Sequence, residues 1–173
     1  MSPPEKPLIL IGMMGAGKST IGRLLAAALE RDFCDSDHGV EIRAGKTITE
    51  IFEQDGEGAF RALENQVMGG LLCHKNTVIA AGGGAFLDND LRTSVIENAT
   101  SIWLKDAPEE MFNRAIGDGD RPRLKADNPH QEFLDLYNAR KQNYALADIT
   151  IECEKASPGE VVKLILKALE GNG

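Results

Sequence analysis

The stretch Gly12-Met13-Met14-Gly15-Ala16-Gly17-Lys18-Ser19-Thr20 decides the fold of this chain. It has the phosphate-loop pattern, which is a glycine, four residues and then Gly-Lys-[Ser/Thr]. An apolar run at residues 8–11 precedes it and an amphipathic segment at residues 21–29 follows it, so the sequence predicts a strand, a glycine loop and a helix. The alternative is a glycine-rich turn that binds nothing. We disfavour it because a chance match rarely has both flanking elements.

The chemistry of this loop predicts that it binds phosphate. Glycines allow backbone N–H groups to face phosphate oxygens, and the start of the following helix adds unpaired donors and the positive end of its dipole. In this pattern Lys18 can reach the outer phosphates, and the hydroxyl of Ser19 is placed to ligate Mg²⁺.

Length and charge restrict the possible partners. The chain has 173 residues, 42% of them hydrophobic, which suits one domain over residues 1–173. The net charge of −8 disfavours a nucleic-acid surface or an anionic membrane surface, because both require clustered Lys and Arg. We therefore expect a small-molecule partner, no nucleic acid and no membrane.

The cysteines indicate a reduced environment. Cys34, Cys73 and Cys153 are odd in number and widely spaced, so neither a disulfide framework nor a zinc site is suggested. No run approaches the roughly 20 apolar residues of a membrane span, and the polar N-terminus has no apolar stretch of signal-peptide length. We expect a cytoplasmic protein.

Strands and helices alternate along the chain. Further strands are predicted at about 32–35, 77–81, 101–104 and 148–152, and helices at about 88–97, 108–116, 133–144 and from 158 onward. Such alternation predicts a three-layer α/β/α fold with a five-stranded parallel sheet.

Two segments interrupt this alternation, and we expect both to serve the site. Residues 36–64 contain short helical pieces, a turn at residues 56–58, and a helix from Ala59 on which Arg61 and Glu64 lie off the apolar face. Residues 117–129 are polar, rich in Gly and Pro, and carry three cations. We interpret 36–64 as a substrate-binding region and 117–129 as a lid hinged near Gly117 and Gly119.

Two aspartates follow the second predicted strand. Asp35 and Asp37 are two residues apart in what we expect to be an extended segment, so both can face one cavity. One carboxylate can serve Mg²⁺, and the other can accept the hydrogen bond of an acceptor hydroxyl. The alternative is that they are turn or cap aspartates before a helix. After the third strand, three consecutive glycines, Gly82-Gly83-Gly84, bring the backbone close to another group.

The order of these motifs resembles the shikimate kinase family over essentially the whole chain. The residues that carry the resemblance are Gly15 to Thr20, Phe33 through Asp35 and Asp37, Ile48 through Phe52, Gly56-Glu57, Phe60-Arg61, Glu64, Gly82-Gly83-Gly84, Arg121-Pro122, and Arg140 with Tyr144. The resemblance implies a nucleoside-monophosphate-kinase-like core with strand order 2-3-1-4-5. It also implies a monomer that transfers the γ-phosphate of ATP to the 3-hydroxyl of shikimate.

The resemblance also implies roles for individual residues. Asp37, Lys18 and Arg121 would be catalytic, and Ser19 and Asp35 would serve Mg²⁺. The nucleotide-binding residues would be Gly15, Ala16, Gly17, Lys18, Ser19, Thr20, Arg114, Arg121 and Pro158. The shikimate-binding residues would be Asp37, Arg61, Gly82, Gly83, Gly84 and Arg140.

The sequence departs from the family pattern in the lid, where Arg123 replaces the first leucine of Arg-Pro-Leu-Leu. Two other functions also fit a phosphate loop. Another small-molecule kinase such as gluconate kinase also pairs a phosphate loop with Asp-x-Asp, but Phe60-Arg61 and the triple glycine disfavour it. A regulatory module that no longer catalyses would be expected to have lost Lys18, Asp37 or Arg121, and this chain keeps all three.

Overall fold

A parallel sheet of five strands forms the centre of the structure, a computed structural model that describes residues 6–117 and 127–172. The strands lie in the order β2-β3-β1-β4-β5, and all four neighbouring pairs are parallel. Their bounds are β1 Leu8–Ile11, β2 Asp32–Asp35, β3 Thr77–Ala80, β4 Thr100–Lys105 and β5 Ile149–Glu152. The predicted fold class and strand order are therefore confirmed.

The burial of each strand follows its place in the sheet. Every residue of the inner strands β1 and β3 is buried, as their continuous apolar sequences require in a sheet covered on both faces. In the edge strand β5, buried Ile149 and Ile151 alternate with exposed Thr150 and Glu152. The central strands therefore fix the position of the loops that follow them.

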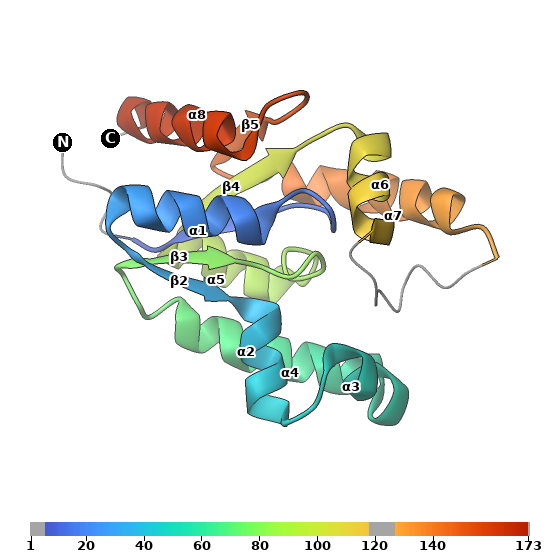
Figure 1. The fold of residues 1–173 in the computed structure, drawn as a ribbon. Helices are drawn as coiled ribbons and strands as arrows, with labels where there is room; N and C mark the ends of the chain where they lie inside the picture. Colours follow the sequence, from blue (N-terminus) through green and yellow to red (C-terminus); the bar gives the residue numbers. More distant parts are fainter. Residues whose placement is uncertain (1–5, 118–126, 173) are drawn as a thin grey trace.

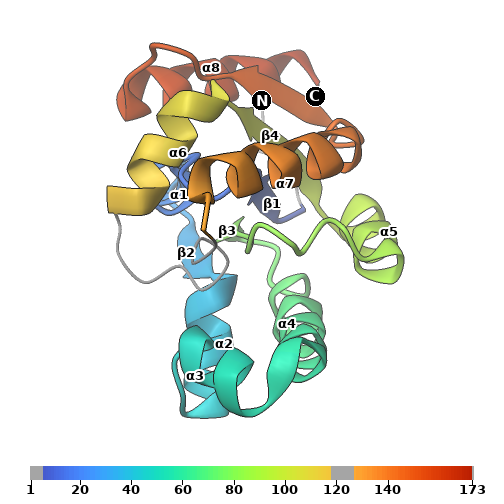
Figure 2. The same cartoon turned by 90° about the vertical axis from the view of Figure 1, so that its right-hand side faces the viewer.

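Helices cover both faces of the sheet (Figures 1 and 2). The helix α1 (Lys18–Leu29) packs beside α8 (Pro158–Gly171), while α5 (Asn89–Asn98) packs on β4. The helix α6 (Pro108–Gly117) contacts α7 (Pro129–Tyr144). No helix in residues 6–117 and 127–172 is long and apolar enough to span a membrane.

Three helices extend beyond the β2 edge of the sheet (Figure 1). They are α2 (Ser36–Ala44), α3 (Ile48–Gln54) and α4 (Gly56–Leu71). A small hydrophobic cluster of Val40, Ile51 and Phe60 holds them together. Thr47 and Glu50 form a capping box at the start of α3. The segment predicted to bind substrate is therefore a packed helical unit.

Two local predictions in this unit were wrong. Residues 56–58 form the first turn of α4 rather than a separate turn, because Gly56 alone, with φ 86°, redirects the chain after α3. The buried residues of α4 are Phe60, Glu64 and Met68, so Glu64 lies on the buried face and not off it.

Candidate active site

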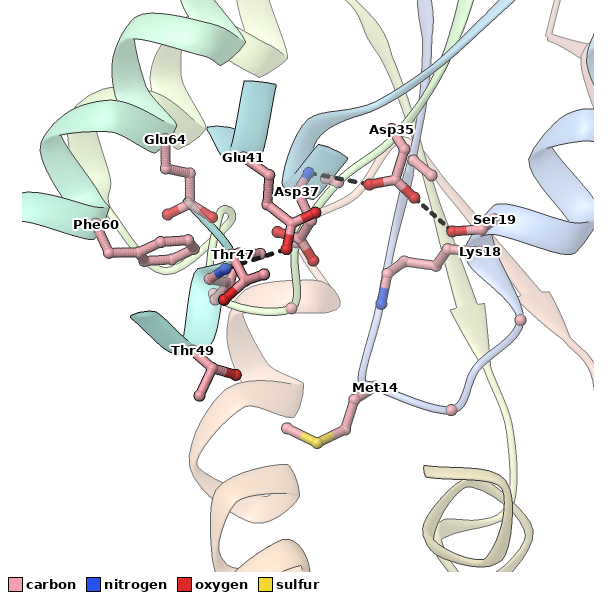
Figure 3. Close-up of a pocket in the computed structure, with 18 of the residues that line it drawn as sticks. Met14, Lys18, Ser19, Asp35, Asp37, Glu41, Thr47, Thr49, Phe60 and Glu64 are labelled. Carbon is pink, nitrogen blue, oxygen red and sulfur yellow. Dashed lines mark hydrogen bonds between the residues drawn. The ribbon is translucent and has the colours of Figure 1, made fainter. Parts of the chain in front are cut away.

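A pocket of about 810 Å³ opens where the first three strands end. The phosphate loop lies on one side and the α2–α4 unit on the other (Figure 3). Of the residues predicted to form the site, those lining the pocket are Gly15, Gly17, Lys18, Ser19, Thr20, Asp35, Asp37, Arg61, Gly82, Gly83, Gly84, Arg114 and Arg140. The fold thus brings together residues that are up to 125 positions apart in the sequence.

The phosphate loop follows β1 directly and ends in α1. Gly15 and Gly17 have φ values of 80° and 88°, a conformation that side chains disfavour. Gly17 is also the residue before the first turn of α1. The Nζ of Lys18 donates hydrogen bonds to the carbonyls of Gly12, at 2.8 Å, and Met13, at 2.9 Å. The ammonium group therefore lies across the loop, where it can reach a phosphate.

Ser19 and Asp35 form an oxygen pair beside this loop. The Oγ of Ser19 donates a 2.6 Å hydrogen bond to Oδ2 of Asp35, and Oδ1 of Asp35 accepts from the backbone N–H of Asp37 (Figure 3). Oδ1 also accepts from the backbone N–H of His38. Asp35 is thus the N-cap of α2, as the cap alternative proposed, and it also contacts Ser19. Oxygen ligands of this kind suit Mg²⁺. The described residues hold no group of three or more His, Cys, Asp or Glu arranged for a metal.

Asp37 lies in the first turn of α2, so the expectation of an extended segment was wrong. Its carboxylate nevertheless points into the same space as the Lys18 side chain (Figure 3). A Cβ added to Gly82 would lie 2.7 Å from Oδ1 of Asp37. The carboxylate therefore lies directly against the backbone that follows β3.

Each of the three consecutive glycines makes room for a polar side chain of the pocket. Gly82 faces Asp37, and a Cβ on Gly83 would lie 3.1 Å from Nη1 of Arg140. A Cβ on Gly84 would overlap the guanidinium of Arg61. Side chains at these positions would displace two carboxylates, those of Asp37 and Glu64, and two guanidinium groups, which accounts for the three glycines.

Glu64 is a pocket residue to which the sequence analysis gave no role. Its side chain is 2% exposed, and Oε2 accepts a 2.7 Å hydrogen bond from Nη1 of Arg61. A charge of this kind is rarely buried unless it is paired. In the sequence, Glu64 is four residues after Phe60 and four before Met68, a spacing that places the three on one face of a helix and indicates that Glu64 is buried. Glu64 therefore fixes the orientation of Arg61.

Other pocket residues had no predicted role either: Met14, Glu41, Thr47 and Thr49. Phe52, which is part of the segment that carries the family resemblance, lines the pocket together with Phe60. Their ring centroids are 4.8 Å apart. The α3–α4 side of the pocket therefore offers an apolar surface beside the charged groups.

Arg114 connects α6 to the phosphate loop. Its Nε donates a 2.7 Å hydrogen bond to the carbonyl of Gly15, and its Nη2 contacts the carboxylate of Asp106. The Asp106 side chain is 5% exposed, so this ion pair is largely shielded from water on one side. The predicted nucleotide contact at Arg114 thus lies beside the loop that receives the phosphates.

The remaining predicted residues lie elsewhere. Ala16 is buried within the phosphate loop, and Pro158 lies in the first turn of α8, outside the pocket lining. Arg121, Pro122, Arg123 and Gly119 lie outside the described residues. Gly117, the other predicted hinge, is the last residue of α6 and lines the pocket.

Known proteins with similar sequences and structures are shikimate kinases. A model of the shikimate kinase family matches residues 14–170. The shikimate kinase of Chromohalobacter salexigens is 42% identical over 161 residues, covering 92% of this chain and 89% of that protein. The enzyme of Persephonella marina is 42% identical over 159 residues, covering 92% of this chain and 96% of that protein.

Solved structures of shikimate kinases are also similar to this chain. The shikimate kinase of Acinetobacter baumannii in complex with shikimate superposes with a TM-score of 0.93 at 37% identity, covering 96% of this chain and 94% of that one. A gluconokinase of Sinorhizobium meliloti has a TM-score of 0.62 at 16% identity, which shows a common fold only.

Proposed function

Because the chain belongs to the shikimate kinase family, we propose that its pocket binds ATP at the phosphate loop and shikimate between that loop and α4. The reaction is transfer of the γ-phosphate of ATP to the 3-hydroxyl of shikimate, which gives 3-phosphoshikimate and ADP. The observation that supports this division of the pocket is a pair of lining arginines, Arg61 and Arg140, which lie against the glycine loop after β3 and not in the phosphate loop.

The phosphate loop binds ATP, the phosphate donor. Backbone N–H groups of the loop and the first turn of α1 surround the β-phosphate, and Lys18 exchanges its bonds to loop carbonyls for phosphate oxygens. Ser19 and Asp35 are the oxygen ligands that would hold Mg²⁺, which when bound neutralises charge on the phosphates. Arg114, beside the loop carbonyl of Gly15, supports the nucleotide.

The part of the pocket near α4 binds the carboxylate of shikimate, the phosphate acceptor. A guanidinium group binds a carboxylate through two parallel hydrogen bonds, which fixes orientation as well as position. Arg61, oriented by Glu64, and Arg140, which is 3% exposed, are placed to do this for the carboxylate of shikimate. The backbone of Gly83 lies against the ring of the substrate, and the absence of a side chain permits that approach.

Asp37 orients the acceptor hydroxyl. A carboxylate on the pocket wall can accept the hydrogen bond of the 3-hydroxyl and take its proton as the bond to phosphorus forms. The proton leaves the hydroxyl oxygen, the γ-phosphorus leaves the β–γ bridging oxygen, and ADP departs. Arg121 would close onto the phosphates in the lid, at about residues 117–129, between α6 and α7. A monomeric state and a cytoplasmic location stay predictions.

The test is ADP release from MgATP with shikimate, with gluconate and with no acceptor, in the parent and in Arg140→Ala. We expect turnover that depends on shikimate, and a shikimate KM that rises roughly 10- to 100-fold in the variant with the ATP KM unchanged, because a charge-assisted hydrogen bond is lost. Unchanged saturation by shikimate in the variant would overturn the proposed carboxylate site.

A further inference from the structure

Tyr144 is a fully buried polar residue that the proposed mechanism does not use. It is the last residue of α7, with 0% of its surface exposed. Its hydroxyl donates a 2.5 Å hydrogen bond to the carbonyl of Gly83 and lies 3.9 Å from the sulfur of Met13. One hydroxyl thus contacts both the glycine loop after β3 and the phosphate loop after β1.

The hydrogen bond from Tyr144 matters because Gly83 lies next to both Arg140 and the phosphate loop. A Cβ built on Gly83 would lie 3.1 Å from Nη1 of Arg140, 3.7 Å from the carbonyl oxygen of Gly12 and 3.8 Å from the backbone nitrogen of Met14. Gly83 is therefore between the arginine proposed to hold the acceptor and the loop proposed to hold the donor. A shift of its backbone would displace Arg140 and so weaken binding of the acceptor.

The hydroxyl of Tyr144 is a hydrogen-bond donor that stays protonated and fixed in place. Burial raises the pKa of its hydroxyl above the usual value, so the group keeps its proton at physiological pH. Its ring is 5.9 Å from the ring of Trp103 in β4, which fixes it against the sheet. Arg140 lies one turn earlier on the same helix and is 3% exposed, so α7 carries both residues to the pocket.

We propose that Tyr144 is a positioning residue, which holds Gly83 and Arg140 in the arrangement that binds the acceptor next to the phosphate loop. The proposal rests on the proposed role of Gly83 and Arg140 in binding shikimate. Tyr144 is not among the residues that line the pocket, so it acts through these neighbours and does not touch substrate.

The test replaces the hydroxyl only. Tyr144→Phe keeps the ring and its packing but leaves the carbonyl of Gly83 without this donor. We expect the shikimate KM to rise about five- to tenfold, the equivalent of one hydrogen bond, with the ATP KM unchanged and kcat lowered less than about twofold. The matched control is Tyr137→Phe, because Tyr137 is the other tyrosine of the chain, on the same helix and 8% exposed. It should leave all three constants unchanged.

A binding measurement without turnover accompanies the kinetics. Isothermal titration calorimetry gives the Kd for shikimate in the parent and in each variant. The Kd for shikimate should rise in Tyr144→Phe by the same factor as the KM, and should not change in Tyr137→Phe. Loss of kcat with unchanged shikimate KM and Kd would overturn the proposal, as would equal effects on both substrates.

Arg140→Ala, measured in parallel, separates this inference from the proposed function. A raised shikimate KM in Arg140→Ala with parental values in Tyr144→Phe would contradict only the role of Tyr144. Parental values in Arg140→Ala would contradict the proposed acceptor site itself, and with it the basis of this inference.

Discussion

The guanidinium of Arg61 lies so close to the Cα of Gly84 that a Cβ at Gly84 would overlap it. The two residues are on different elements, α4 and the loop after β3, so their contact joins the helical unit to the end of the sheet. It also means that the orientation of Arg61 depends on the absence of a single methyl group.

Replacing Gly84 by Ala should therefore displace Arg61. We expect the shikimate KM to rise roughly 10- to 100-fold, as for loss of a charge-assisted hydrogen bond, with the ATP KM unchanged. Gly69→Ala is the control, because a Cβ at Gly69 in α4 meets nothing within 4 Å. That control should keep its activity and gain up to about 1 kcal/mol of stability from helix propensity. Equal shikimate KM values in the two variants would contradict the account.

Glu64→Ala should affect the same arginine from the opposite side. Because Glu64 is 2% exposed and bonded to Arg61 at 2.7 Å, its removal should raise the shikimate KM about tenfold and lower the free energy of unfolding by about 1–3 kcal/mol. Glu57 also contacts Arg61, but at 3.6 Å and with 59% of its side chain exposed. Glu57→Ala should change stability by less than about 1 kcal/mol. Steady-state kinetics and urea unfolding test both variants, and similar effects in the two would contradict the role of Glu64.

The strand order could be predicted because the phosphate loop and the alternation of elements restrict the topology, and the family resemblance supplies the order. The location of Glu64 was predicted wrongly, because the apolar residues that follow Phe60 at helical spacing fit two adjacent faces of α4. Only the packing of α4 against α2 and α3, through Val40 and Ile51, decides between them.

The contacts of Asp35 could not be predicted from the sequence either. A cap aspartate and a metal-site aspartate have the same local pattern, and Asp35 combines a cap with a contact to Ser19. The role we infer for Tyr144 depends on the carbonyl of Gly83, 61 residues away. The spacing of apolar residues along one segment cannot predict a contact between two distant segments.

Asp106→Ala should weaken ATP binding selectively. The carboxylate pairs with Arg114, which donates to the carbonyl of Gly15 in the phosphate loop. Without it Arg114 keeps only the carbonyl of Gly15 among the partners in the described residues, and we expect the ATP KM to rise about five- to tenfold with the shikimate KM unchanged.

The matched control is Glu152→Ala, which removes the exposed ion pair with Lys105, 3.0 Å long, on the adjacent strand. It should leave both KM values unchanged. An unchanged ATP KM in Asp106→Ala would contradict the role of Asp106 in positioning Arg114.

The three cysteines should react with a thiol reagent at very different rates. Burial raises the pKa of Cys153 to about 12, so at pH 8 only about one molecule in 10⁴ carries the reactive thiolate. Burial, with the neighbouring charge of Asp32, also raises the pKa of Cys34, while Cys73 is exposed.

Labelling of the folded protein at pH 8, followed by mass spectrometry, should modify Cys73 first, Cys34 more slowly and Cys153 last. Because a raised pKa means less thiolate, the rate at Cys153 should increase about tenfold per pH unit up to its pKa while the fold persists. Early modification of Cys153 would contradict its burial.

The central claim is that Asp37 orients the acceptor hydroxyl while the phosphate loop binds ATP independently. The most direct measurement is the rate of ADP release with saturating shikimate and MgATP in Asp37→Asn, together with the Kd for ATP. We predict a kcat lowered roughly 10²- to 10⁴-fold with an unchanged Kd for ATP, because the substitution removes the carboxylate without touching the loop. A variant that turns over at the parental rate would contradict the account.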